Sequence, residues 1–130
     1  MNRLRAAALL LLLTACAPLH PLAPPPDPRT AGRLIVVRSD ALFDWGFRLP
    51  VRLNGEPAVR LRAGEHREFQ LPPGIYSVGT ADREIAVAVE TGKTVWFLIR
   101  PEEGSLSGFD IERLDPAAGR AWTARTRPAP

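Results

Sequence analysis

The stretch FRLPVRLNGEPAVRLR, residues 47–62, carries the clearest structural pattern in this sequence. Apolar and polar residues alternate on both sides of Asn54-Gly55, as in strands with one buried and one exposed face. Asn-Gly is also a strong signal for a hairpin turn. A two-residue loop would place Leu49 opposite an arginine and mix the two faces. Extending the loop by Glu56 places Leu49 opposite Leu61, so we predict a hairpin with a three-residue loop.

Further strand signals precede and follow this hairpin. RLIVVR, residues 33–38, is a short run rich in β-branched residues, typical of a buried strand. REFQLPPGIYSVG, residues 67–79, predicts two strands joined by a type II turn, in which Pro73 and Gly74 take the two central positions. FDIERL, residues 109–114, predicts a last strand.

A second hairpin is predicted for REIAVAVETGKTVWFLIR, residues 83–100, with Thr91-Gly92-Lys93 as its loop. This register pairs the apolar residues of the two arms: Ile85, Val87 and Val89 would lie opposite Ile99, Phe97 and Val95. On the other face small residues would meet large ones: Ala86 and Ala88 would lie opposite Leu98 and Trp96.

One short helix is predicted after the strands. Asp115 can cap it and Pro116 can occupy its first position, although Gly119 weakens it. Trp122 would either cover the sheet around Trp96 or dock on a partner. The end of the chain, RTRPAP, is expected to be frayed.

Together these segments predict an all-β fold, a small antiparallel β-sandwich of about seven to eight strands, because turns recur every 8 to 12 residues or so. The β-sandwich domain covers residues 33–115, and residues 116–130 form the short helix and a flexible tail. We expect five residues in the core: Phe69, Tyr76, Val87, Phe97 and Ile99.

The first fifteen residues read as a targeting segment. Two arginines precede a purely apolar run, residues 6–13, which is too short to span a bilayer and suits a secretory signal. Leu13-Thr14-Ala15-Cys16 then resembles a bacterial lipobox. The resemblance implies that residues 1–15 are a lipoprotein signal peptide and that Cys16, the single cysteine, is lipidated. The alternative is an ordinary signal peptide in which Cys16 is incidental.

Residues 16–32 form a linker between the lipidated cysteine and the domain. Six prolines lie within it, so it is extended and semi-rigid and could hold the domain up to about 50 Å from the lipid surface. Ala17 follows the cysteine, where signals for retention in the inner membrane usually have Asp. By resemblance the destination is therefore the periplasmic leaflet of the outer membrane.

Composition argues against several functions. The net charge is +3, and two of the arginines belong to the leader, so the mature chain is nearly neutral and lacks the basic excess of a nucleic-acid binder. The two histidines, His20 in the linker and His66 in a charged turn, form no catalytic or metal-binding pattern. The glycines do not form a phosphate loop. We therefore expect no enzyme activity, metal or cofactor.

Two surfaces are candidates for binding. The outward face of the first hairpin carries four arginines, which are either solvated and paired with acids or available to an anionic partner: Arg48 opposite Arg62, and Arg52 and Arg60. The loop before this hairpin carries Phe43 and Trp45. These rings either plug the end of the sandwich or stack on a sugar or a protein partner.

Three short motifs in the predicted strands and turns resemble those of a known family. Leu53-Asn54-Gly55, then Leu71-Pro72-Pro73-Gly74 before Tyr76, then residues 88–94 before an apolar strand, resemble a family of bacterial lipoproteins known as domain-of-unknown-function 2846. The same marks occur in PEGA-type domains, which are small transthyretin-like β-sandwiches of bacterial surfaces. The resemblance covers about residues 33–114 and implies an architecture and a location, but no reaction.

The sequence thus predicts a lipid-anchored, non-enzymatic lipoprotein of the bacterial outer membrane that acts as a structural or protein-interaction module in the periplasm. The alternative is a module that binds peptidoglycan or lipopolysaccharide through Trp45, Phe43 and the arginine face. A protein module should have an apolar patch or an open sheet edge. A glycan binder should have Trp45 exposed beside the arginines and a groove.

Overall fold

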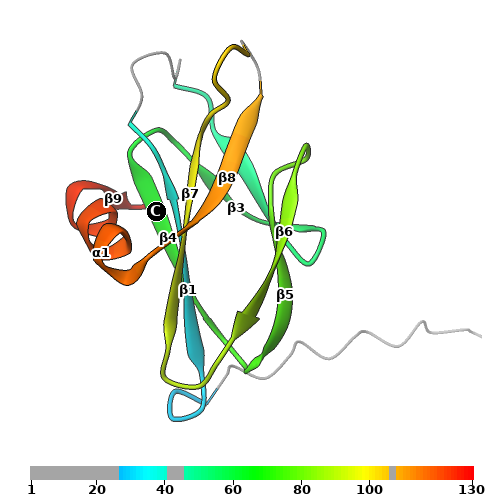
Figure 1. The fold of residues 1–130 in the computed structure, drawn as a ribbon, viewed down its shortest axis with the longest axis vertical. Coiled ribbons are helices and arrows are strands. Elements are labelled where there is room, and N and C mark those ends of the chain that lie inside the picture. The colour runs from blue at the N-terminus through cyan, green and yellow to red at the C-terminus, as the bar shows by residue number, and fades with distance from the viewer. Residues whose placement is uncertain (1–26, 41–45, 106–107) are drawn as a thin grey trace, which may run out of the picture.

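The computed structural model describes residues 27–40, 46–105 and 108–130. Figure 1 shows strands forming most of this part of the chain, with one short helix at its side. The strands are β1 (Gly32–Arg38), β2 (Leu49–Leu53), β3 (Glu56–Leu61), β4 (Glu65–Leu71), β5 (Gly74–Gly79), β6 (Glu84–Val89), β7 (Thr94–Pro101), β8 (Phe109–Leu114) and β9 (Arg127–Pro128), and the helix is α1 (Pro116–Arg125).

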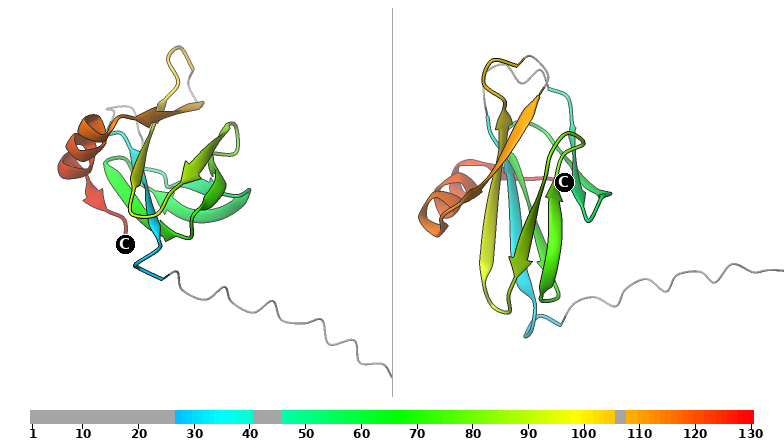
Figure 2. Two further views of the ribbon diagram at one scale, coloured as in Figure 1. Left: turned by 60° about the horizontal axis from the view of Figure 1, so that its bottom comes forward. Right: turned by 45° about the vertical axis from the view of Figure 1, so that its right-hand side comes forward.

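The strands form two sheets that pack face to face (Figures 1 and 2). The larger sheet has the order β8-β7-β1-β4-β9, and the smaller sheet has the order β3-β2-β5-β6. This confirms the predicted all-β sandwich, with nine strands in the described residues rather than seven to eight. The extra strand is the two-residue β9, which is too short to give a sequence signal.

Not all pairings are antiparallel. β1 pairs in parallel with β7, and β4 pairs in parallel with β9. Between β1 and β7 the chain forms β2 and β3 in the smaller sheet, then β4 on one side of β1, then β5 and β6 in the smaller sheet. It returns as β7 on the other side of β1. Parallel neighbours need such a long crossover, and local sequence patterns do not report it.

The first hairpin has the predicted pairing but a different loop. Leu49 pairs with Leu61 as expected, and both side chains are buried. The turn has two residues instead of three, because Asn54 and Gly55 both have positive φ, 52° and 76°, as a type I′ turn requires. A β-bulge next to Val51 then shifts the register by one residue and restores the pairing of the apolar side chains.

The predicted second hairpin is wrong. β6 belongs to the smaller sheet and β7 to the larger one, so the loop at Gly92 crosses from one sheet to the other. Val87 and Phe97 therefore meet across the core rather than along one sheet. Ala86 and Ala88 are exposed on the outside of the smaller sheet, far from the predicted partners. Two neighbouring apolar strands look alike in sequence whether they pair side by side or face to face.

The link from β4 to β5 also crosses between the sheets. Gly74 starts β5, and it is absent from the described residues with positive φ, so the predicted type II turn is wrong. The bend is instead closed by Tyr76, whose hydroxyl donates to the carbonyl of Pro72 at 2.6 Å.

The core fills the space between the sheets. Val87, Phe97 and Ile99 are buried as predicted, whereas Phe69 and Tyr76 are half-buried at its margin. The other buried members of this cluster come from seven strands: Leu34, Val36, Leu49, Val51, Leu61, Val78, Val89, Val95 and Ile111.

Helix α1 covers the outer face of the larger sheet. Its cap is as predicted, since the Asp115 carboxylate accepts from the amide of Ala118 at 2.8 Å. Trp122 packs on a second buried cluster that includes Trp96, which settles the alternatives stated for this residue in favour of packing. Gly119 lies directly on the Trp96 ring, where a methyl group would overlap it. The tail after α1 is not frayed, because β9 pairs with β4.

No helix in the described part of the chain is both long and apolar enough to cross a membrane.

Candidate functional site

Several predicted site residues lie outside the described residues. These are the lipobox and the aromatic loop residues: Leu13, Thr14, Ala15, Cys16, Phe43 and Trp45. The predicted arginines are described, and the structure divides them between two places.

Three of the four predicted arginines lie around one small depression at the seam between β3 and β4. Arg48, Arg60 and Arg62 line it, together with Arg67, and its volume is about 320 Å³. We call this place the arginine depression; its remaining lining residues are Ala58, Val59, Glu65 and Pro130. Arg52 is not part of it. In the sheet Arg52 pairs with Pro57, and its side chain lines a different pocket.

The arginines of this depression are poorly neutralised. Among the residues that the structure describes, no carboxylate lies within 4.0 Å of the guanidinium groups of Arg48, Arg60 or Arg62. Arg60 pairs in the sheet with a proline, Pro50. In the described strands these arginines therefore lack the acidic partners of a solvated, ion-paired face.

Glu65 is the one acid in the lining, and its carboxylate is already engaged. It is only 4% exposed. One oxygen accepts from the backbone amide of Arg62 at 2.9 Å, and the other lies 3.7 Å from the Arg127 guanidinium. It also attracts Arg38. The Glu65 carboxylate is thus bound to the Arg62 amide and to Arg127, and it does not neutralise the side chains of Arg48, Arg60 and Arg62.

Arg38 is a buried cation behind this region. Its side chain is fully buried, and Nη1 donates to the carbonyls of Phe47 at 2.7 Å and Leu61 at 2.6 Å. The guanidinium also lies over the rings of Phe47 and Phe109. Burial lowers the pKa of Arg38 to about 10, and the charge of Glu65 partly opposes this shift. Arg38 therefore stays charged at neutral pH and ties β1 to the first hairpin.

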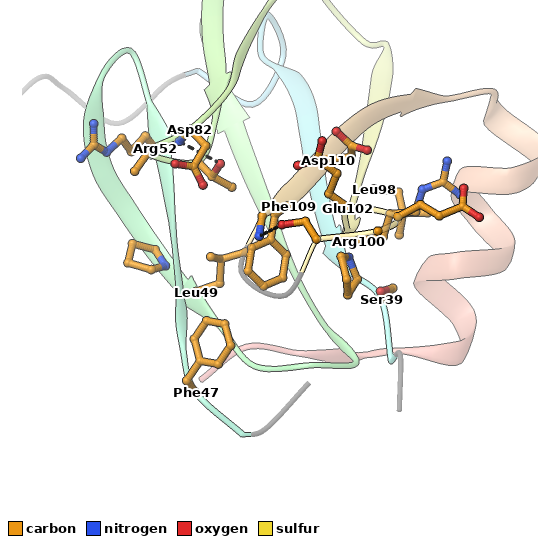
Figure 3. Close-up of a pocket in the computed structure, with 18 of the residues that line it drawn as sticks. Ser39, Phe47, Leu49, Arg52, Asp82, Leu98, Arg100, Glu102, Phe109 and Asp110 are labelled. Atoms are coloured by element: carbon orange, nitrogen blue, oxygen red, sulfur yellow. Dashed lines mark hydrogen bonds between the residues drawn. The ribbon is translucent and has the colours of Figure 1, made fainter. Parts of the chain in front are cut away.

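A larger pocket opens at one pole of the sandwich (Figure 3). Its volume is about 1260 Å³. Apolar groups such as Leu49 and Phe109 line it beside charged ones such as Arg52, Asp82 and Glu102. Ser39, which follows β1, lies in this wall, whereas Asp27, the first described residue, precedes β1 at the opposite pole.

One ion pair beside this pole pocket joins the two sheets. An ion pair between Arg83 and Asp110 spans from the start of β6 to β8 beside it.

The edge of the smaller sheet at β6 is a third surface feature. In the described strands β6 pairs with β5 alone. Next to it, Ile75 of β5 is 74% exposed and lies opposite Ala88, which is also exposed. No sequence prediction singled out this edge. The segment EIAVAV could have indicated an unprotected edge strand, because it contains one charge and no proline.

His66 has a structural place. It lies in β4, and its Nδ1 is 2.9 Å from the hydroxyl of Thr126, which donates to the carbonyl of Trp122. Burial lowers the pKa of His66, opposed by the charge of Glu68. No group of three or more metal-ligating side chains occurs among the described residues. His66 thus fastens the end of α1 to the sheet.

No protein-family model matches the chain, and no curated protein matches it significantly. Among solved structures, it is similar to the N-terminal domain of AlgF from P. aeruginosa, with 11% sequence identity and a TM-score of 0.44. The match covers 69% of this chain and all of that one.

Proposed function

We propose that this protein is a non-enzymatic, lipid-anchored lipoprotein of the outer membrane that faces the periplasm and binds another protein through the open edge of β6. The observation that carries this proposal is the edge itself. A strand at a sheet edge presents unpaired backbone donors and acceptors, which a strand from a second protein can pair with.

The other sheet edges carry features that discourage such pairing, whereas β6 does not. β3 contains Pro57 and pairs through a bulge, β8 contains Asp110 and Glu112, and β9 has two residues. Prolines, bulges, charges and short strands are the means by which proteins protect edges. The only charge in β6 is at its first residue, so this edge is the one suited to accept a strand.

The neighbouring surface favours a protein partner over a glycan. Ile75 and Ala88 form an exposed apolar spot beside the edge on the outside of the smaller sheet. The helix covers only the outside of the larger sheet (Figure 2). An open edge beside apolar side chains favours a protein partner, because a second protein can add a strand to the edge and cover the apolar side chains.

The test is photo-crosslinking in intact cells that produce the full chain. A photoreactive residue at Ala86, which is exposed in β6, should give a discrete crosslinked protein band. Ala88→Lys places a charge on the same edge and should abolish the band, as edge lysines block strand addition. The matched control is a photoreactive residue at Ala121, an exposed alanine of α1, which should give no band.

Two results would contradict the proposal. One is a band at Ala86 that persists in the Ala88→Lys variant, since the contact would then not depend on the edge. The other is capture of peptidoglycan or lipopolysaccharide instead of protein, with a crosslinker at Arg60 as a parallel probe. That result would establish the alternative of a glycan-binding module.

A further inference from the structure

We propose that the arginine depression is a binding site for a phosphate group. This inference is independent of the β6 edge, which lies at the other end of the strand order of the smaller sheet. It rests on the charge balance of the depression, on the origin of its side chains and on the absence of neutralising acids in the described surroundings.

The charge balance is unusual for this chain. The side chains of four arginines and one glutamate line the depression, which leaves an excess of three positive side-chain charges. Without the two leader arginines the chain has 15 basic and 14 acidic residues, a formal net charge of +1, so the residues outside the depression sum to −2. The excess positive charge of the protein is thus gathered at one place.

The concentration of positive charge in the arginine depression lowers the stability of the fold. Arg48 directly precedes Leu49 and Arg62 directly follows Leu61, and these two leucines are paired. Like charges at neighbouring positions of paired strands destabilise a sheet. An anion bound between the arginines would remove this repulsion.

The side chains come from both sheets. Arg60 belongs to β3 of the smaller sheet, and Arg67 belongs to β4 of the larger one. Arg67 donates to the carbonyl of Pro130 at 3.5 Å, and Arg62 is held by its backbone bond to the Glu65 carboxylate. The turn between β3 and β4 therefore brings guanidinium groups together around a hollow instead of spreading them over one flat face.

Phosphate fits this arrangement better than a carboxylate does. The guanidinium fork donates two parallel hydrogen bonds to phosphate oxygens. A phosphate monoester carries a charge of about −1.5 to −2 and three acceptor oxygens, so it can engage several arginines at once and offset most of the excess charge. A single carboxylate offers one negative charge and two oxygens.

The phosphate could belong to a soluble ester or to a lipid headgroup, and two probes distinguish these sources. The full-length protein in a neutral detergent is titrated calorimetrically with inorganic phosphate and with dihexanoyl phosphatidic acid below its micelle concentration. Both should bind the wild-type protein. Similar affinities indicate recognition of the phosphate group alone, and tighter binding of phosphatidic acid indicates a lipid ligand.

The variant R60Q/R62Q removes two of the guanidinium groups and should weaken binding by about tenfold or more, since charged hydrogen bonds are lost. Both residues are exposed, so the fold should persist. The control R113Q/R120Q removes the same charge from two exposed arginines elsewhere and should change the affinity by less than about twofold.

Three outcomes overturn this proposal: no binding of either probe, equal weakening by both double variants, or equal displacement of phosphate by chloride at matched ionic strength. None of them depends on β6. A failure here and a failure of the proposed function are therefore distinguishable.

Discussion

Arg38 shows how one residue links two parts of this fold. Its guanidinium donates to the carbonyls of Phe47 and Leu61, and the charge of Glu65 favours its charged form. Without the guanidinium these two carbonyls lose their donor, and each buried acceptor left without a donor costs about 1–3 kcal/mol. Arg38→Met should therefore lower the free energy of unfolding by about 2–5 kcal/mol, measured by urea denaturation.

A double variant tests the reason for that loss. R38M/E65Q also removes the charge of Glu65, so the stability that it recovers relative to R38M measures the interaction between the two charges. Arg120→Met, at an exposed position of α1, serves as the control and should change stability by less than about 0.5 kcal/mol. If R38M behaves like this control, the buried guanidinium has no structural role.

At the scale of the element, α1 depends on a glycine that helix propensity alone would reject. Gly119 allows the helix backbone to rest on the Trp96 ring. Gly119→Ala should gain up to about 1 kcal/mol of helix propensity but lose more through overpacking, about 1–3 kcal/mol. The expected result is a lower melting temperature.

The exposed position Ala121 isolates the propensity effect in the same helix. Ala121→Gly should cost roughly 1 kcal/mol, with no effect on the contact with Trp96. A higher melting temperature for Gly119→Ala would mean that α1 moves away from the sheet without cost.

At the scale of the whole molecule, the described chain begins near Asp27 at one pole of the sandwich, and the larger pocket opens at the opposite pole. If Cys16 is the anchor, Cys16→Ala should abolish labelling with palmitate and release the protein from the outer-membrane fraction. A soluble, unlabelled wild-type protein would instead support an ordinary signal peptide.

Ala17→Asp tests which membrane the lipidated protein is delivered to. By resemblance to inner-membrane retention signals, this variant should keep the lipid label and move to the inner-membrane fraction. Thr14→Ser preserves a small residue before the cysteine and should leave both labelling and location unchanged.

The sequence by itself determined the all-β class and the pairing of Leu49 with Leu61 through the alternation of side chains, and the cap of α1 through Asp115-Pro116, because each depends on residues close in the chain. The alternation also placed four arginines on one face, of which Arg48, Arg60 and Arg62 line the depression. The tertiary structure alone decided that β6 and β7 lie in different sheets, that Arg67 and Glu65 join those arginines, and that Arg52 does not. The physical reason is that an apolar strand buries its face equally well beside a neighbour or across the core, and the difference between these arrangements depends on residues distant in sequence.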